Sequence, residues 1–185
     1  MTRSLDRYTD IHSHDRAKAL DGDTIVNIEP GQTMLDGGTY SVGIHPWHTD
    51  RPVTLSQLKQ LVAAASDPRV AAIGECGFDT LRGGDIDTQS RLFDLHARLA
   101  EQTHKPLIIH AVHAYPQLFD AIRRHRPTVE WIIHGFRGKP ETARQLVAAG
   151  YRISLGNLYN QAVPTVINPG FIYRETDAPD TVVEK

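Results

Sequence analysis

Two histidines placed two positions apart raise the question of chemistry in this chain. The segment "TDIHSHD" (9–15) puts Asp10, His12 and His14 at alternate positions of a predicted strand. Alternate side chains of a strand point to the same face, so the three groups would project together. Two imidazoles directed into one space are typical of a metal site. A lone His-x-His pair is equally compatible with a surface or structural role, so the rest of the chain must supply further ligands.

Other titratable side chains directly follow short apolar runs, as in "AIGE", "LIIH" and "WIIH". A core strand does not end in such a group without a partner, because an unpaired buried charge is costly. Imidazole and carboxylate ligands together suit Zn, Mn, Fe or Ni and need no thiolate. Six such groups exceed the needs of one tetrahedral zinc and suit two metals sharing a carboxylate. The further candidates are Glu75, His110, His134 and Asp177, with Glu75 as the natural bridge and His45 on another run.

The elements that must position these groups alternate along the chain. Eight short apolar runs predict strands, and near-continuous apolar strands are typical of parallel sheets. Helical spacing of apolar residues between the later runs predicts helices, and therefore βα units. The predicted strands are 8–14, 24–30, 40–47, 70–79, 106–113, 129–136, 151–157 and 170–177, and the predicted helices are 54–67, 88–105, 115–125 and 140–150.

This alternation predicts an α/β fold, a TIM-like (β/α)₈ barrel formed by a single domain over residues 1–185. The 185 residues fall short of the roughly 250 that are typical of this fold. Full helices after strands 1, 2 and 8 are therefore expected to be missing, which would leave outer strands bare and favour a homo-oligomer. An open doubly wound sheet is the structural alternative. In a parallel barrel the C-terminal strand ends share one mouth, where the candidate ligands would meet.

Composition narrows the class of protein. The chain is 40% hydrophobic and 23% charged, an ordinary globular profile. A formal net charge of −2 gives no basic footprint for strong duplex binding. Cys76 is the only cysteine, which excludes an intramolecular disulfide and fits a reducing cytoplasm. No apolar run suggests a signal peptide or a membrane span, so we expect a cytoplasmic protein without membrane attachment.

Six motifs in order, "DIHSH", "VGIHPW", "AIGECGFD", "PLIIHAVHA", "WIIHGFRG" and "ETDAP", resemble the TatD family of metal-dependent hydrolases, a branch of the amidohydrolase-like barrels. The resemblance covers nearly the whole chain. Known members are nucleases or phosphodiesterases, so it implies a TatD-like deoxyribonuclease that cleaves a phosphodiester substrate, such as single-stranded DNA ends. It also implies two divalent metal ions (Zn, Mg or Mn), with Glu75 between them and Asp177 beside the attacking water as the catalytic groups. The implied metal ligands are His12, His14, Glu75, His110, His134 and Asp177.

The chain departs from the family pattern near the expected substrate. The fifth-strand motif of the family usually carries an Arg two residues after its His, where this chain has Val112 followed by His113. A phosphate contact made by that Arg would be lost or taken over by His113. We expect substrate contacts from His45, His113 and Phe136, the last by stacking on a base. For His45, within "GIHPW", a purely structural turn is the alternative.

Two other functions compete with phosphodiester hydrolysis. Related barrels with similar ligands hydrolyse C–N or C–O bonds of small amides, lactones or deaminase substrates. Many of these carry a Lys on the fourth strand, whereas the fourth strand here carries Glu75, which favours the phosphodiesterase. The second alternative is a degenerate barrel that binds metal without turnover.

Overall fold

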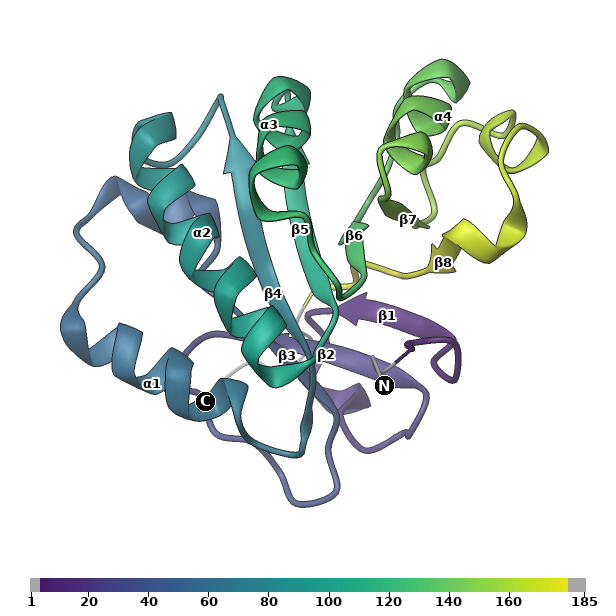
Figure 1. Cartoon of the computed structure of the whole chain (residues 1–185). Helices are drawn as coiled ribbons and strands as arrows, with labels where there is room; N and C mark the ends of the chain where they lie inside the picture. The colour runs from purple at the N-terminus through teal and green to yellow at the C-terminus, as the bar shows by residue number, and fades with distance from the viewer. Residues whose placement is uncertain (1–3, 180–185) are drawn as a thin grey trace.

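A computed structural model describes residues 4–179 and contains one eight-stranded parallel sheet (Figure 1). Each strand pairs with the next along the chain, in the order β1 to β8. The strands are β1 Asp10–Ser13, β2 Thr24–Ile28, β3 Tyr40–Val42, β4 Val70–Asp79, β5 Leu107–Val112, β6 Trp131–Ile133, β7 Arg152–Leu155 and β8 Ile172–Arg174. The helices are α1 Leu55–Ala65, α2 Ile86–Thr103, α3 Tyr115–His125 and α4 Pro140–Ala148. The predicted TIM-like barrel is confirmed.

The barrel is nearly closed, because the segment after β8 returns to β1. The backbone nitrogen of His14 donates to the carbonyl of Ala178 at 2.8 Å, and that of Asp177 donates to the carbonyl of His12 at 3.0 Å. These two hydrogen bonds place the last predicted ligand beside the first two.

Two apolar clusters divide the strand residues by face. The smaller one contains Ile25, Ile108 and Ile132 and includes no helix residue, so it fills the barrel interior. The larger one contains their strand neighbours, such as Val26 and Ile109, together with side chains of all four helices. Because side chains alternate along a strand, the same backbone supplies both layers.

The four predicted helices are present, each after one of the strands β3 to β6. Local sequence sets where they begin. Thr54 and Gln57 form a reciprocal capping box at the start of α1, and the Asp85 carboxylate accepts from the backbone nitrogen of Thr88 at the start of α2. Pro140 is the first residue of α4, where its missing N–H costs nothing. Among residues 4–179, no helix is both long and apolar enough to span a bilayer.

The missing helices follow the expectation for the first two strands, because the link between β2 and β3 contains no helix. Between β1 and β2 there is only a three-residue 3₁₀ turn, Arg16–Lys18, as expected. Another short 3₁₀ helix, Pro46–Asp50, follows β3. The link from β7 to β8 also lacks an α-helix and has two 3₁₀ turns, Val163–Thr165 and Pro169–Phe171, which the sequence did not indicate. The prediction that no full helix follows β8 concerns residues that lie largely outside the described range.

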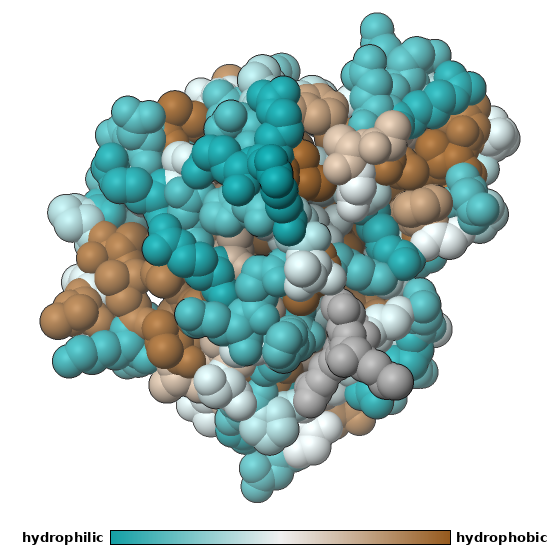
Figure 2. All heavy atoms as spheres, viewed as in Figure 1, coloured by the Kyte–Doolittle hydropathy of each residue, from teal (hydrophilic) through white to brown (hydrophobic). Residues whose placement is uncertain are grey.

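The prediction of bare outer strands is wrong for β2. Val26 and Ile28 are only 0% and 2% exposed, because Ala19 and Met34 from the short connections pack against the same cluster. Exposed apolar side chains lie elsewhere, including Leu55 and Val62 on α1. Figure 2 shows hydrophobic residues gathered at the α1 edge and around the α4 and β7–β8 region. The predicted homo-oligomer could therefore not form through an exposed apolar face of β2.

Candidate metal centre

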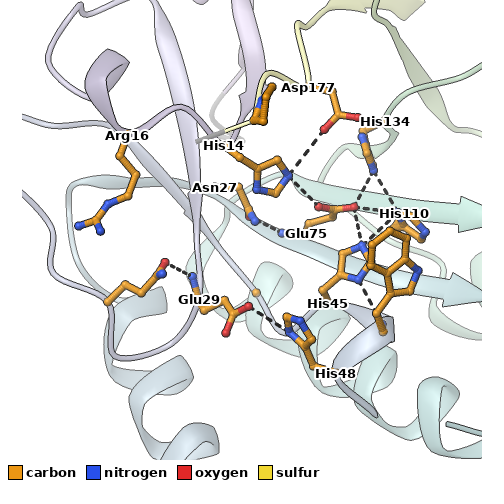
Figure 3. Close-up of a pocket in the computed structure, with 14 residues that line it drawn as sticks. His14, Arg16, Asn27, Glu29, His45, His48, Glu75, His110, His134 and Asp177 are labelled. Carbon is orange, nitrogen blue, oxygen red and sulfur yellow. Dashed lines mark hydrogen bonds and ion pairs between the residues drawn. The ribbon is translucent and has the colours of Figure 1, made fainter. Parts of the chain in front are cut away.

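The six predicted ligands lie together at the C-terminal mouth of the barrel. Figure 3 labels all of them except His12. They come from five regions that are far apart in sequence: the end of β1, the middle of β4, β5, the residue after β6, and the segment after β8. Glu75 is at the centre, 3% exposed, within a strand that is buried along its whole length.

The two carboxylate oxygens of Glu75 face two different groups of imidazoles. Oε2 lies 3.3 Å from His12 Nε2 and 3.4 Å from His14 Nε2. Oε1 lies 2.8 Å from His134 Nε2, 2.8 Å from His110 Nδ1 and 2.9 Å from His45 Nε2. One side chain thus contacts five imidazoles, two through one oxygen and three through the other.

Asp177 completes the cluster on the β1 side. Its Oδ1 lies 3.6 Å from His14 Nε2 and 3.8 Å from His12 Nε2. The side chain is 39% exposed, in contrast to Glu75. Its backbone has a φ of +48°, a left-handed conformation that is uncommon outside glycine and asparagine or aspartate. The segment after β8 therefore presents an open carboxylate beside a buried one.

Burial and ion pairing oppose each other at the centre. Burial alone would raise the pKa of Glu75, but the surrounding imidazoles, His134 first, hold it well below its ordinary value. Burial would lower the pKa of His134, yet Glu75 and Glu175 keep it well above the ordinary histidine value. For His45 burial prevails, and its pKa is lowered. The centre is thus an anionic carboxylate surrounded by rings that compete for protons.

The donor set fits divalent cations. His12 is fully buried, and neither of its ring nitrogens has a hydrogen-bond partner among the described residues. A buried imidazole without a hydrogen bond is costly, and a cation at a ring nitrogen removes that cost. Within residues 4–179, three groups have ligand atoms within 4.8 Å of one another: His12, His14 and Asp177; His12, Glu75 and His134; and His45, Glu75 and His110. Two of these groups share Glu75.

Three supporting residues were not identified from the sequence. The Asn27 side-chain oxygen accepts from the Glu75 backbone nitrogen at 2.7 Å and so fixes β4 beside β2. Glu175 Oε1 lies 3.5 Å from His134 Nδ1, and Asp79 Oδ2 lies 3.4 Å from His110 Nε2. The only sequence signal was the position of Asp79 and Glu175 inside the "GECGFD" and "ETD" motifs; Asn27 lies in neither motif. Asp10, predicted to share a strand face with His12 and His14, does not join the cluster. Its carboxylate instead accepts hydrogen bonds from Thr176, in the segment after β8.

Two hollows flank the cluster and share Trp47, His110, His134 and Asp177 in their walls. The first, about 570 Å³, is lined by His45 and by polar side chains that include Arg16, Glu29 and Gln32. The second, about 560 Å³, is lined by His113, Tyr115, Phe136 and Arg137.

The three predicted substrate residues differ in their access to these hollows. His45 touches the cluster itself, His113 is exposed, and Phe136 is only 3% exposed. Phe136 therefore supports the wall of the second hollow and offers little surface for stacking. Trp47 is 40% exposed and lines both hollows.

Comparison with known proteins places the chain among relatives of the same architecture. The family model described as TatD related DNase matches residues 29–183. The chain is 32% identical over 153 residues to an Escherichia coli protein named "Uncharacterized metal-dependent hydrolase YjjV", covering 76% of this chain and 58% of that protein. It is 32% identical over 155 residues to a Mycobacterium tuberculosis protein named "Uncharacterized metal-dependent hydrolase TatD", covering 75% and 57%. A third relative, "3'-5' ssDNA/RNA exonuclease TatD" of Erwinia billingiae, is 30% identical over 119 residues, covering 62% and 44%.

Solved structures agree. The crystal structure of YjjV, a TatD homologue from Escherichia coli, superposes with a TM-score of 0.75 at 25% identity, covering 98% of this chain and 83% of that one. A TatD family hydrolase from Entamoeba histolytica gives a TM-score of 0.73 at 18% identity, covering 92% and 73%, and supports the fold alone. The chain spans less than two thirds of the length of the curated relatives described above. From the extent of the family match, the chain belongs to the TatD-related DNase family.

Proposed function

We propose that this chain is a metal-dependent hydrolase of phosphodiester bonds and that it acts on the ends of single-stranded DNA. The family supports a hydrolase of this type, and the Erwinia billingiae relative is named as an exonuclease for single-stranded DNA and RNA. The net charge of −2 is in keeping with a substrate held locally at its end rather than with a long duplex.

The observation that carries the proposal is the division of Glu75 between two imidazole groups. Its Oε2 faces His12 and His14, while its Oε1 faces the other three rings. This supports two divalent cations, Zn, Mg or Mn, held by His12, His14, Glu75, His110, His134 and Asp177. Such cations supply charge to polarise the phosphoryl oxygens and to lower the pKa of a water molecule.

The remaining chemistry falls to the side chains at the mouth. Asp177 is the most exposed carboxylate of the cluster and lines both hollows, so it accepts the proton of the attacking water. Glu75 is buried and, with its lowered pKa, stays ionised, so it holds the surrounding imidazoles in place. His45 contacts the substrate phosphate from the first hollow, and His113 does so from the second. Phe136 shapes the wall behind His113.

The domain organisation and the localisation belong to the same proposal. We propose that residues 1–185 act as one domain, in the cytoplasm, where the buried Cys76 stays a free thiol. A homo-oligomer remains a prediction. Size-exclusion chromatography with light scattering tests it directly.

The test compares metal-free protein with protein reloaded with Zn²⁺, Mn²⁺ or Mg²⁺. The substrates are bis-p-nitrophenyl phosphate, a 5′-labelled single-stranded oligonucleotide, its duplex, and a panel of small amides and lactones. Glu75→Gln removes the shared charge, and Glu141→Gln, an exposed residue in the first turn of α4, is the matched control. We expect metal-dependent cleavage of both phosphodiesters, a loss of at least about 100-fold in Glu75→Gln, and no change in the control.

Other outcomes separate the alternatives. Cleavage of amides or lactones without phosphodiester cleavage would establish the amidohydrolase alternative. Protein that binds metal but is silent on every substrate would be a degenerate barrel. Undiminished turnover in Glu75→Gln would remove the shared-carboxylate mechanism.

A further inference from the structure

Asp79, the last residue of β4, is a buried carboxylate at the edge of the metal centre. It is 3% exposed. Its Oδ1 accepts from the backbone nitrogens of Leu81 at 2.8 Å and Arg82 at 3.2 Å. Its Oδ2 accepts from Trp47 Nε1 at 2.6 Å and lies 3.4 Å from His110 Nε2. Asp79 Oδ2 therefore contacts both His110, a candidate metal ligand, and Trp47, which lines both hollows.

The orientation of His110 determines which ring nitrogen is free. Its Nδ1 points into the cluster, 2.8 Å from Glu75 Oε1, while its Nε2 points away to Asp79. A neutral imidazole has one N–H and one lone pair, and a cation takes the lone pair. With a cation at Nδ1, the ring proton sits on Nε2, where an ionised carboxylate is an acceptor and never a competing donor.

We infer that Asp79 is a positioning residue that holds His110 with its proton on Nε2, so that Nδ1 is presented to a divalent cation. The same oxygen anchors Trp47, which ties the substrate wall to the metal centre. This inference rests on the proposed metal dependence but not on the identity of the substrate.

Asp79 is itself held in place. Gln89, 1% exposed, accepts from the Asp79 backbone nitrogen at 2.8 Å and donates to the Asp79 carbonyl at 2.9 Å. The same amide nitrogen donates to the carbonyls of Arg82 and Gly84. The Arg82 guanidinium lies over the Trp47 ring, 4.5 Å from its centroid. The carboxylate, the loop and the tryptophan therefore form one fixed unit.

Asp79→Asn distinguishes this role from simple support of the loop after β4. An amide has one acceptor oxygen and one donor nitrogen. If its oxygen serves Leu81 and Arg82, its nitrogen opposes the Trp47 N–H and drives the His110 proton to Nδ1. Trp47→Phe instead removes one donor and leaves Oδ2 to His110. Asp85→Asn, which changes the same charge at the cap of α2, is the matched control.

The experiment measures Zn²⁺ affinity and stoichiometry by calorimetry in these variants, in His110→Gln, and in the double variant of Asp79→Asn with His110→Gln. We expect Asp79→Asn to weaken zinc binding about 10- to 100-fold, with both controls within about twofold of the wild type. The double variant should bind as His110→Gln alone, because Asp79 acts through that ring. Wild-type zinc affinity in Asp79→Asn, or an equal loss in Trp47→Phe, would overturn the inference.

A second readout needs no variant. In zinc-loaded wild-type protein with ¹⁵N-labelled histidine, His110 should show a metal-bound Nδ1 and a slowly exchanging proton on Nε2. Zinc on Nε2 would overturn the inference even if Asp79→Asn fails to fold. Protein that binds zinc in this way but cleaves no phosphodiester would refute the proposed function and leave the role of Asp79 intact.

Discussion

The carboxylate of Asp10 on β1 accepts hydrogen bonds from both the backbone nitrogen and the hydroxyl of Thr176, at 3.1 and 2.6 Å. It also accepts from the backbone nitrogen of His12 at 3.2 Å. One buried side chain therefore joins the first strand, which carries the ligand His12, to the segment that follows the last strand.

Removing this carboxylate should loosen the closure of the barrel. We expect Asp10→Ala to lower the free energy of unfolding by about 2–3 kcal/mol, because buried donors lose a charged acceptor. Thr176→Val removes only the hydroxyl partner and should cost roughly half as much. Urea unfolding measures both. An unchanged midpoint in Asp10→Ala would show that the other contacts close the barrel without it.

Glu175 should strengthen metal binding by His134, because it contacts the ring nitrogen that does not face Glu75. His134 Nδ1 and Glu175 Oε1 are 3.5 Å apart, and the Ser154 hydroxyl donates to the other oxygen of the carboxylate. Glu175→Gln should weaken zinc binding about 10-fold, because the ring loses the negative charge beside its Nδ1. Glu130→Gln, which contacts Tyr173 and Arg152 instead, is the control. Equal zinc affinities in the two variants would contradict this role.

The stabilisation that metal brings should increase with pH. The raised pKa of His134 gives the metal-free protein stability that is present below about pH 6.5 and lost as pH rises through the higher folded value. The lowered pKa of Glu75 gives stability that is present above about pH 4.3 and lost as pH falls through the folded value. A bound cation replaces the proton on His134, so binding is favoured as pH rises.

Thermal unfolding with and without Zn²⁺ between about pH 6 and 8 measures this dependence. The increase in Tm that zinc produces should grow across this window. A zinc effect that is constant or shrinks toward pH 8 would contradict the ion pair between Glu75 and His134.

His96 should make the protein acid-sensitive without touching the cluster. It is fully buried, its Nε2 accepts from the Ile44 backbone nitrogen at 3.0 Å, and its Nδ1 donates to the Leu92 carbonyl at 2.8 Å. Burial lowers its pKa from 6.5 to about 4. Below pH 6.5 the unfolded chain binds a proton that the folded chain refuses, so stability falls as pH drops toward 4.

His96→Gln supplies a similar acceptor and donor that do not titrate. The difference in unfolding free energy between pH 7 and pH 5 should be smaller in this variant by about 2 kcal/mol. Urea unfolding at both pH values provides the comparison. The same pH dependence in both proteins would mean that His96 is not the acid-sensitive group.

The sequence predicted the barrel and the convergence of ligands because both depend on local patterns. Apolar runs mark the strands, and a titratable group such as His134 directly after such a run identifies a C-terminal strand end. In a parallel barrel, side chains at the C-terminal ends of the strands all face the same mouth. Assigning the strands in chain order was therefore sufficient to predict that residues far apart in the sequence meet there.

The supporting contacts could not be predicted because they depend on pairs that are distant in sequence. Asp79 meets Trp47 across 32 positions, and Asp10 meets Thr176 across 166. The segment between β7 and β8 folds into two 3₁₀ turns, whose positions no pattern in the sequence marked. Phe136 shows the same limit, because its position after β6 did not reveal that it is buried.

The most direct test of the shared role of Glu75 is the number of zinc ions held by each chain, measured by native mass spectrometry on metal-free protein titrated with Zn²⁺. The account predicts two ions per wild-type chain and the loss of paired occupancy in Glu75→Gln. A single ion per wild-type chain, or two ions retained in Glu75→Gln with unchanged affinity, would contradict it.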